Sequence, residues 1–428
     1  MNLSPNAYRR APRPQGLFRA LRHRNYRLFF AGQGISLVGN WMTTTATYWL
    51  VYRMTGDVRL LGLVAFANQI PGVLVTPIAG VLVERWNRRR VLVATQVFAM
   101  IQSLALAALA LSGAIREWHI LVLAVFQGLV NGFDIPARQA FVLDMVESKQ
   151  DLGNAIALNS SLFNGSRLIG PVIAGAIIAR LGEGLCFLID GVSYIAVIAS
   201  LLAMRIHQAT PQAPSGRVWH GLKEGFIYAH RFLPVRAILL LVCVMSFAGM
   251  PYFTLLPVLA SDVLHGDSNT YGRLLGAVGL GALGGAVYLA SHPGVLRFGR
   301  KIPIAACIFG TGLIGLSQST LLWLSYPMLL LTGAGMMVTM ASCNTVIQTI
   351  ADDTKRGRVI SLYTLAFIGM MPVGNLVYGQ IAKIIGAPAT ILLGGAVCVT
   401  AGLAFYRQVP RLRLIVSPIY AKLDLPLT

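Results

Sequence analysis

Three ionisable side chains that could carry chemistry lie within long apolar stretches of the sequence, namely Asp134, Arg167 and Asp190. A charge in hydrocarbon is costly, and such residues are retained mainly where they move protons, ions or substrates. We therefore predict that Asp134 carries a proton and that Arg167 pairs with it in one state of the protein. A permanent structural pair, or a bridge from Asp134 to Arg138 one helical turn away, is an equally favoured alternative. Asp190 is a second candidate proton site, although its place near a helix start favours an exposed carboxylate.

Other chemistries lack their sequence signatures. Glycine is never followed by lysine, so there is no GxxxxGK[ST] phosphate loop, and neither CxxC nor HExxH occurs. The five cysteines are far apart and lie in apolar stretches, which is typical of small core residues rather than of a disulfide framework or a metal site. None of the seven histidines forms an interpretable motif with an acid. The sequence predicts no enzyme, no metal and no cofactor, with a proton gradient as the energy source.

The elements that must position these charges are transmembrane helices. Of the 428 residues, 56% are hydrophobic and only 12% are charged, which is far too apolar for a water-soluble domain. A bilayer core needs about 20 apolar residues per helix, and twelve such runs occur. They are 26–51, 59–83, 91–113, 119–143, 153–180, 185–205, 237–261, 272–291, 303–321, 324–349, 359–382 and 388–406. The expected fold class is an all-α integral membrane protein with two bundles of six helices.

The basic residues predict how the helices are oriented. With the N-terminus inside, 28 of the 35 Lys and Arg residues fall in cytoplasmic segments and six in outer ones. This bias predicts that both termini are cytoplasmic. A net charge of +20 would suggest nucleic-acid binding on a soluble domain, but here it lies in short clusters between apolar runs. The expected partner of these clusters is therefore the lipid bilayer and not a nucleic acid.

A polar stretch divides the chain into two related halves. The expected organisation is an N-terminal segment, a first bundle, a linker, a second bundle and a tail, at 1–24, 25–206, 207–235, 236–407 and 408–428. Residues 153–182 align without gaps to 357–386, and five glycines coincide at an offset of 204. A shared need for close helix packing could enrich glycine in both segments, but duplication is the favoured explanation. Like-oriented repeats of six helices suit a transporter in which one half rocks against the other.

The loop after the second predicted helix carries a recognisable motif. It contains Gly80, Glu84, Arg85, Arg88 and Arg89. A basic loop of this kind can simply set topology. The stretch also resembles the GxLxDRxGRR loop of the major facilitator superfamily, although glutamate replaces the family's aspartate and asparagine replaces its second glycine. The resemblance implies that the acidic residue and its arginine partners form a latch that stabilises the outward-open state.

The fourth and fifth predicted helices resemble the exporter branch that includes the enterobactin exporter and related drug–proton antiporters. The similar segments are 131–141 and 154–175, and the resemblance covers most of the chain. Gly165, Gly170, Pro171 and Gly175 resemble the antiporter motif, in which proline and glycine bend the helix and allow tight packing. A kinked helix without directional meaning is the alternative. The resemblance favours export over import.

Polar and aromatic residues within the predicted helices could line a substrate cavity. They are Gln33, Asn40, Trp41, Asn68, Gln127, Asn131, Tyr252, Asn344, Tyr363 and Asn375. Each one alone is more often an interhelical hydrogen bond or an interface anchor. A mainly apolar cavity with few fixed charges suits an amphipathic substrate.

We therefore predict a monomeric secondary transporter of the bacterial inner membrane. It exports a small amphipathic molecule, such as a siderophore or a drug, by alternating access and in exchange for protons. An importer on the same fold is the first alternative. A lipid flippase is the second.

Overall fold

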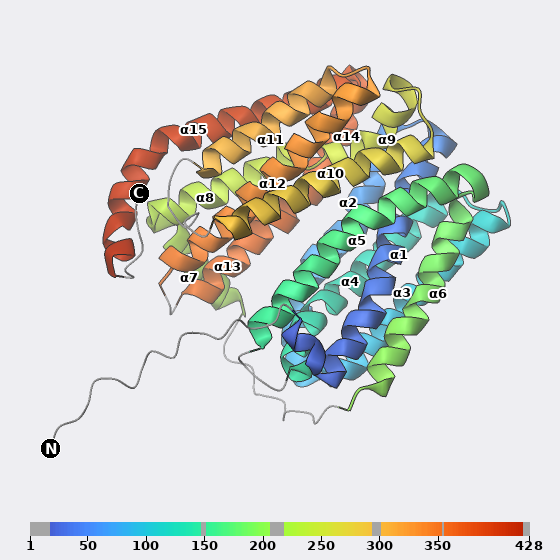
Figure 1. Ribbon diagram of the computed structural model, residues 1–428, viewed down its shortest axis with the longest axis horizontal. Helices are drawn as coiled ribbons and strands as arrows, with labels where there is room; N and C mark the ends of the chain where they lie inside the picture. The colour runs from blue at the N-terminus through green and yellow to red at the C-terminus, as the bar shows by residue number, and fades with distance from the viewer. Residues whose placement is uncertain (1–17, 147–150, 206–217, 293–300, 353–354, 423–428) are drawn as a thin grey trace.

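The structure, a computed structural model, describes residues 18–146, 151–205, 218–292, 301–352 and 355–422. Throughout these ranges the regular elements are helices, arranged in two bundles (Figure 1). The N-terminal bundle contains α1 (Arg24–Thr55), α2 (Val58–Arg85), α3 (Arg88–Leu111), α4 (Glu117–Met145), α5 (Leu152–Leu181) and α6 (Glu183–Ala203). The C-terminal bundle contains α8 (Leu233–Val244), α9 (Tyr252–Val258), α10 (Ser268–Ser291), α11 (Lys301–Ser317), α12 (Leu322–Ile350), α13 (Arg356–Thr364), α14 (Met370–Ile385) and α15 (Ala387–Lys422).

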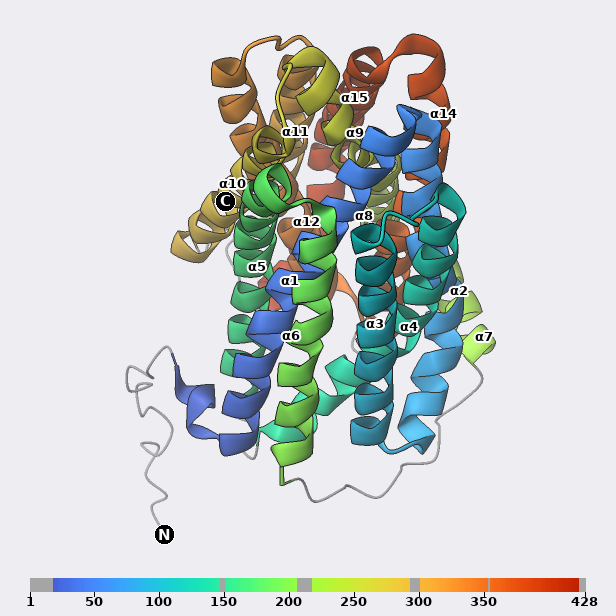
Figure 2. The ribbon, with the colours of Figure 1, turned by 90° about the vertical axis from the view of Figure 1, so that its right-hand side faces the viewer.

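The twelve predicted spans are present as helices, and the predicted fold class is confirmed. Ten helical segments are long and apolar enough to cross a membrane. The other two are α1, which is interrupted by polar residues, and α11, which has 17 residues. The helices of both bundles run roughly parallel in Figure 2, as a bilayer requires of helices that satisfy their own backbone hydrogen bonds.

Two spans of the C-terminal bundle are not continuous α-helices. The seventh span joins α8 and α9 through a π-helical turn at Met245–Gly249, and a second π-helical turn follows α9 at Leu259–Val263. The eleventh span joins α13 and α14 through a third turn of this kind at Leu365–Gly369. The sequence analysis did not foresee these interruptions.

The predicted linker and tail contain more helix than expected. Helix α7 (Val218–Arg231) lies within the linker range 207–235 and packs against α13. Glu224 of α7 forms an ion pair with Arg358, and the Lys355 ammonium lies 5.1 Å from the centre of the Tyr228 ring. Helix α15 continues through the range assigned to the tail, as far as Lys422.

The internal repeat is visible in the helix bounds. Helix α5 covers Leu152–Leu181, and α13 begins and α14 ends 204 residues later, at Arg356 and Ile385. Gly182 and Gly386 follow these two segments with φ of 81° and 83°, a left-handed conformation that favours glycine. The two halves therefore share the same helix and the same turn, as the duplication predicts.

The bundles meet at one end of the molecule. We call the end with the start of α1 and with α7 the linker end, and the opposite end the far end. Near the far end, a Cβ on Gly272 of α10 would lie 2.4 Å from the Pro171 carbonyl oxygen of α5. The related helices do the same, since a Cβ on Gly62 of α2 would lie 2.4 Å from the Asn375 carbonyl oxygen of α14. Two symmetry-related glycine contacts therefore hold the bundles together there.

Hydrogen bonds and rings reinforce this closure. Tyr52 of α1 hydrogen-bonds to Asp262 across the junction. The Ser268 hydroxyl donates to the Gly175 carbonyl at 3.2 Å. The ring of Trp49 stacks on Tyr271 with centroids 5.8 Å apart. In Figure 1 the ribbons of the bundles lie together near α9 and α10 and separate towards α7 and α13. The described bundles are therefore joined at the far end and parted at the linker end.

Candidate functional site

Asp190 is deeply buried, with 1% of its surface exposed. Its Oδ2 accepts hydrogen bonds from Ser103 Oγ at 2.6 Å and Thr43 Oγ1 at 2.9 Å, while Oδ1 has no hydrogen-bond partner. Gly39 makes room for this oxygen, since a Cβ there would lie 2.7 Å from Oδ1. The expectation of an exposed carboxylate was wrong, because position in a helix does not tell which face is covered by neighbouring helices.

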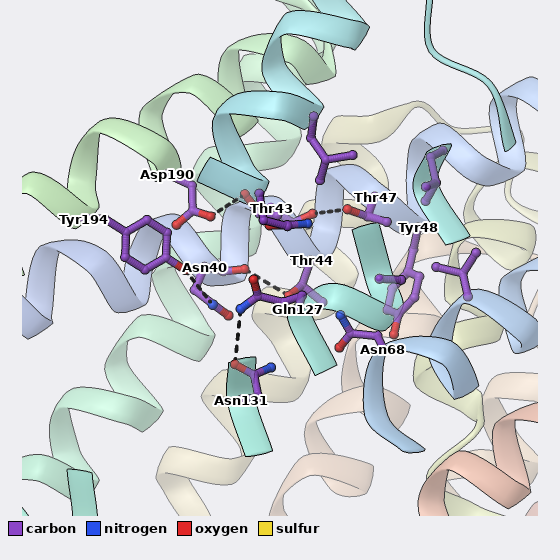
Figure 3. Close-up of a pocket in the computed structure, with 15 residues that line it drawn as sticks. Asn40, Thr43, Thr44, Thr47, Tyr48, Asn68, Gln127, Asn131, Asp190 and Tyr194 are labelled. Carbon is purple, nitrogen blue, oxygen red and sulfur yellow. Dashed lines mark hydrogen bonds between the residues drawn. The ribbon is translucent and has the colours of Figure 1, made fainter. Parts of the chain in front are cut away.

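Asp190 borders a polar cavity inside the N-terminal bundle (Figure 3). The cavity volume is about 70 Å³, and because one water needs roughly 10–15 Å³, it can hold several waters. Figure 3 shows Asn40 and Thr43 of α1, Gln127 and Asn131 of α4, and Asp190 of α6 around this space. The amides, hydroxyls and carboxylate of this lining offer hydrogen bonds to water, while Val64, Leu106, Ile120 and Ala124 form an apolar part of the wall.

Asp134 of α4 is also buried, with 5% exposed. Its Oδ1 accepts hydrogen bonds from Gln96 Nε2 at 2.7 Å and Thr95 Oγ1 at 2.9 Å. Its Oδ2 forms an ion pair with Arg138. The structure thus has the bridge between neighbouring helical turns that the sequence left as an alternative, and the Asp134–Arg167 pair is not formed.

The two carboxylates are linked by adjoining cavities. Asp134 and Arg138 line a second cavity of about 30 Å³. Both cavities share the same four lining residues, Asn40, Gln127, Asn131 and Tyr194. Two hydrogen bonds cross this shared zone, from Asn40 Nδ2 to Tyr194 Oη at 3.5 Å and from Gln127 Nε2 to Asn131 Oδ1 at 3.2 Å. We call the two cavities with their shared residues the polar corridor.

The corridor connects different depths of the membrane. Asp190 is the eighth residue of α6. At about 1.5 Å per residue it lies about 10 Å from the start of that helix, which is at the far end of the molecule. By the same rule Asp134 lies about 16 Å from the C-terminal end of α4, which is at the linker end of the molecule. The hydrocarbon core is roughly 30 Å thick, so both groups lie well inside it.

Arg167 lies in the middle of α5, at the junction of the bundles. Its guanidinium carbon is 5.7 Å from the centre of the Trp41 ring, and Nη2 is 3.9 Å from the Met336 sulfur of α12. Its Nε is buried without a hydrogen-bond partner. Among the described residues, no ion pair joins Arg167 to an acidic side chain.

A larger cavity runs between α4 and α5. Its volume is about 460 Å³, and α5 lines it with Ile156, Ser160 and Phe163 among others. The next residue in this four-three-four spacing is Arg167, so the same face of α5 leads to the guanidinium. Trp41 contacts both the guanidinium of Arg167 and the cavity-lining Phe163. Its ring lies edge-on to Phe163 with centroids 5.9 Å apart.

The predicted latch residues lie at the linker end of α2 and α3. Arg88 pairs with Asp144 of α4 at 3.1 Å, and Arg89 donates to the Leu202 carbonyl at 2.6 Å. Both partners belong to the N-terminal bundle, so these contacts do not cross between bundles.

The remaining latch residues make less contact. A Cβ on Gly80 would meet nothing within 4 Å, and Arg85 is exposed. The side chain of Glu84 lies outside the described part of the structure.

The antiporter-type segment of α5 packs against two neighbours. A Cβ on Gly170 would lie 2.6 Å from Trp41 Cβ, and one on Gly175 would lie 2.6 Å from the Ser268 carbonyl oxygen of the other bundle. Pro171 is buried. Gly165 differs, since nothing lies within 4 Å of the position its Cβ would take. The expected tight packing thus occurs at Gly170 and Gly175.

The ten residues predicted to line one substrate cavity do not lie around a single space. Five of them line the polar corridor, namely Gln33, Asn40, Asn68, Gln127 and Asn131. Trp41 and Tyr252 are at the junction of the bundles, where each lies near the Phe253 ring, and the Tyr252 hydroxyl has no hydrogen-bond partner.

The other three predicted residues form hydrogen bonds within the C-terminal bundle. The Tyr363 hydroxyl donates to the Met340 carbonyl at 2.8 Å. Asn375 accepts from Thr254 at 3.0 Å, and Asn344 accepts from Gln348. For these three the interhelical or local hydrogen bond describes the structure better than a cavity lining.

The sequence analysis missed several partners of the two carboxylates. These are Thr43, Thr95, Gln96 and Ser103. Tyr194, which accepts a hydrogen bond from Asn40 in the polar corridor, was also not predicted. A signal for Thr43 was present, because Asn40, Thr43 and Thr47 recur at helical spacing in the first predicted helix. The partners on α3 also recur at helical spacing, since Thr95 and Gln96 are followed seven residues later by Gln102 and Ser103.

A carboxylate at the linker end binds two residues of the segment just before α1. Asp151 forms an ion pair with Arg19 and accepts a hydrogen bond from His23 Nε2 at 2.9 Å. The His23 hydrogen bond and the Arg19 guanidinium hold the pKa of Asp151 below its usual value. These contacts attach the segment before α1 to the junction of α4 and α5.

Almost the whole chain is similar to a known protein family. A family model described as transmembrane secretion effector matches residues 15–416, which includes all twelve spans. The chain belongs to the transmembrane secretion effector family. It is a secretion or efflux transporter of the major facilitator superfamily.

Several characterised transporters are similar in sequence over most of this chain. The staphyloferrin A transporter of Staphylococcus aureus is 26% identical over 393 residues, covering 90% of this chain and 97% of the relative. The multidrug efflux pump Tap of Mycobacterium tuberculosis is 26% identical over 418 residues, covering 92% and 94%. A macrolide efflux protein of Streptococcus pyogenes is 22% identical over 398 residues, covering 88% and 95%.

Solved structures share the fold. A peptide transporter has a TM-score of 0.72 at 14% identity, covering 91% of this chain and 94% of that one. A bacterial homologue of the human lysosomal transporter Spinster, solved in an inward-facing conformation, has a TM-score of 0.67 at 14% identity, covering 94% and 98%. At this identity the likeness concerns the fold alone.

Proposed function

We propose that this transporter exports a small amphipathic molecule by alternating access in exchange for protons. Siderophore-like and drug-like molecules are the substrate class, in keeping with relatives named for staphyloferrin A, for macrolides and for multidrug efflux. The protein acts as a monomer in the bacterial inner membrane, with the proton gradient as its energy source and no cofactor. The linker end, where the basic clusters gather, faces the cytoplasm.

The observation that carries proton exchange is the polar corridor. Asp134 and Asp190 are both buried within the membrane interior, and adjoining cavities with room for water lie between them. A carboxylate in such a place changes charge only if a proton can reach it, and water between amides and hydroxyls provides the path. Asp190 receives the proton from the outer side, and Asp134 releases it towards the cytoplasm.

The closure at the far end is the basis for proposing which state of the transport cycle the structure represents. Glycine contacts join the bundles at the far end, and their ribbons separate towards the linker end in Figure 1. With the linker end in the cytoplasm, the structure corresponds to the inward-open state, in which an exporter receives substrate. The latch formed by Glu84 and its arginine neighbours then acts in the opposite, outward-open state.

The experiment measures protons and substrate together. Candidate siderophores and lipophilic cations are added to purified protein in detergent, and proton release is recorded for wild type and Asp134→Asn. Release that the substitution abolishes, in a protein that still folds and binds, supports exchange through Asp134. Binding without any proton change in either protein contradicts it.

Direction of transport needs a second measurement. In inverted membrane vesicles an exporter accumulates the ligand inside when the vesicle lumen is acidified. Loss of preloaded ligand under the same gradient would instead identify an importer, and movement of a fluorescent phospholipid between leaflets would identify a flippase.

A further inference from the structure

Arg167 carries a charge for which the described structure provides no counter-charge. Its Nε is buried and has no hydrogen-bond partner, and its described contacts include the Trp41 ring and the Met336 sulfur. The carboxylate expected to neutralise it, Asp134, is occupied by Arg138. An uncompensated guanidinium at mid-membrane depth is costly, so a ligand that neutralises it would be bound strongly.

The surroundings of Arg167 define the rest of the ligand. The Trp41 ring contacts Phe163 of its own bundle at 5.9 Å and Phe253 of the other bundle at 6.1 Å. Aromatic faces of this kind hold planar apolar groups through stacking and edge contacts. The guanidinium therefore lies beside an aromatic surface formed by both bundles.

A cavity lies one helical turn from Arg167, along the same face of α5. The cavity of about 460 Å³ is lined by Ile156, Ser160 and Phe163, and Arg167 is the next residue on that face. This cavity lies towards the linker end, where the bundles are parted. Arg138 also lines it, but its charge is paired with Asp134.

We infer that Arg167 is a substrate-binding residue that accepts the carboxylate of an amphipathic, aromatic or apolar anion. The planar guanidinium can offer two parallel N–H donors to one carboxylate, which a lysine cannot. Trp41, Phe163 and Phe253 hold the apolar part. This inference rests on the proposed export function. It assigns the charge of the substrate to the junction of the bundles, apart from the polar corridor, which lies within the N-terminal bundle.

The test uses two ligands that differ in one group. 2-Naphthoate and 2-naphthamide have nearly the same shape, but only the first is an anion at neutral pH. Binding to the full-length protein in detergent is followed by quenching of tryptophan fluorescence. We expect wild type to bind the carboxylate about tenfold more tightly than the amide, which corresponds to one strong charge-assisted hydrogen bond.

Variants then assign the preference to one residue. Arg167→Gln should lose the preference and keep the affinity for the amide, and Arg167→Lys should retain part of it because the charge remains while the fork is lost. Arg180→Gln is the matched control, since Arg180 is an exposed arginine at the far end of the same helix. It should keep the preference.

Two results would overturn the inference. Wild type could bind the two ligands equally, a result that does not depend on any variant folding correctly. Arg167→Gln could retain the preference while eluting as a folded monomer. Neither result touches proton release or vesicle transport, so the proposed function would stand; conversely, a carboxylate preference without proton release would leave this inference intact and contradict proton exchange.

Discussion

Gly175 of α5 and Gly272 of α10 approach so closely that a Cβ built on either lies 3.0 Å from the Cα of the other. The two residues belong to different bundles, and the contact has a counterpart between Gly62 and Gly379, where a Cβ on either glycine lies 3.1 Å from the other Cα. Since real Cβ atoms do not approach other atoms much more closely than this, the far end closes only because neither helix carries a side chain there.

Gly272→Ala should therefore open the far end. Its Cβ would lie 2.4 Å from the Pro171 carbonyl oxygen. Overpacking of this kind costs about 1–3 kcal/mol, which shifts the balance of two states roughly 5- to 150-fold. Hydrogen–deuterium exchange should increase in residues 171–181. Gly284→Ala in the same helix is the control, because nothing lies within 4 Å of its Cβ position; equal exchange in both variants would contradict the prediction.

Asp190→Asn should uncouple transport from protons. The amide keeps the size and most hydrogen-bonding capacity of the carboxylate but cannot take up a proton at neutral pH. We expect the protons moved per substrate molecule, measured with a pH-sensitive dye in proteoliposomes, to fall to background. The double variant with Asp134→Asn should be no worse than either single variant, because both residues belong to one pathway. Additive losses would mean two separate pathways.

Tyr194→Phe tests the corridor without altering a charge. Tyr194 lines both cavities, and its hydroxyl accepts a hydrogen bond from Asn40. Removal of the hydroxyl should slow proton-coupled transport about tenfold, equivalent to about 1.4 kcal/mol in the barrier, with little change in ligand binding. Tyr363→Phe is matched to it, since that hydroxyl bonds to the Met340 carbonyl in the other bundle. If both variants slow transport alike, the corridor is not the proton route.

Asp151 predicts a pH dependence of stability at the linker end. Its pKa in the folded protein is lowered by His23 and Arg19, so the folded state favours the ionised carboxylate. The resulting stabilisation is present above the unfolded pKa of about 3.9 and is lost as the pH falls through the lower folded value. Thermal unfolding midpoints of wild type and Asp151→Asn should differ at pH 7, and the difference should shrink as the pH falls below about 3.9. A constant difference over this range would show that the contribution is not electrostatic.

Gly182→Ala and Gly386→Ala should each destabilise one half of the repeat. Both glycines have φ near +80° and an extended ψ, a region essentially restricted to glycine where a residue with a side chain loses about 1–3 kcal/mol. The two losses in free energy of unfolding should add, since the turns lie in different bundles. Gly153→Ala, within α5 and without close neighbours, should be neutral or slightly stabilising. Chemical denaturation in detergent measures wild type, the three single variants and the double variant of Gly182 and Gly386.

Sequence predicted best what depends on local composition. The twelve spans follow from apolar runs of sufficient length, and the pairing of Asp134 with Arg138 follows from their spacing on one helix. The burial of Asp190 could not be foreseen, because it depends on Thr43 and Ser103 from two other helices. The surroundings of Arg167 could not be foreseen for the same reason, because Met336 lies on a helix of the other bundle and contacts between distant segments are not encoded in either segment alone.

The three π-helical turns, at Met245–Gly249, Leu259–Val263 and Leu365–Gly369, all lie in the C-terminal bundle. A π turn spaces its hydrogen bonds one residue wider than an α-helix and often marks a functional site. Within the described chain, the corresponding first and fifth spans of the N-terminal bundle run as uninterrupted α-helices. In the proposed rocking motion we expect the C-terminal bundle to deform and the N-terminal bundle to move as a stiff lever, which keeps the distances along the proposed proton route constant while the substrate side changes shape.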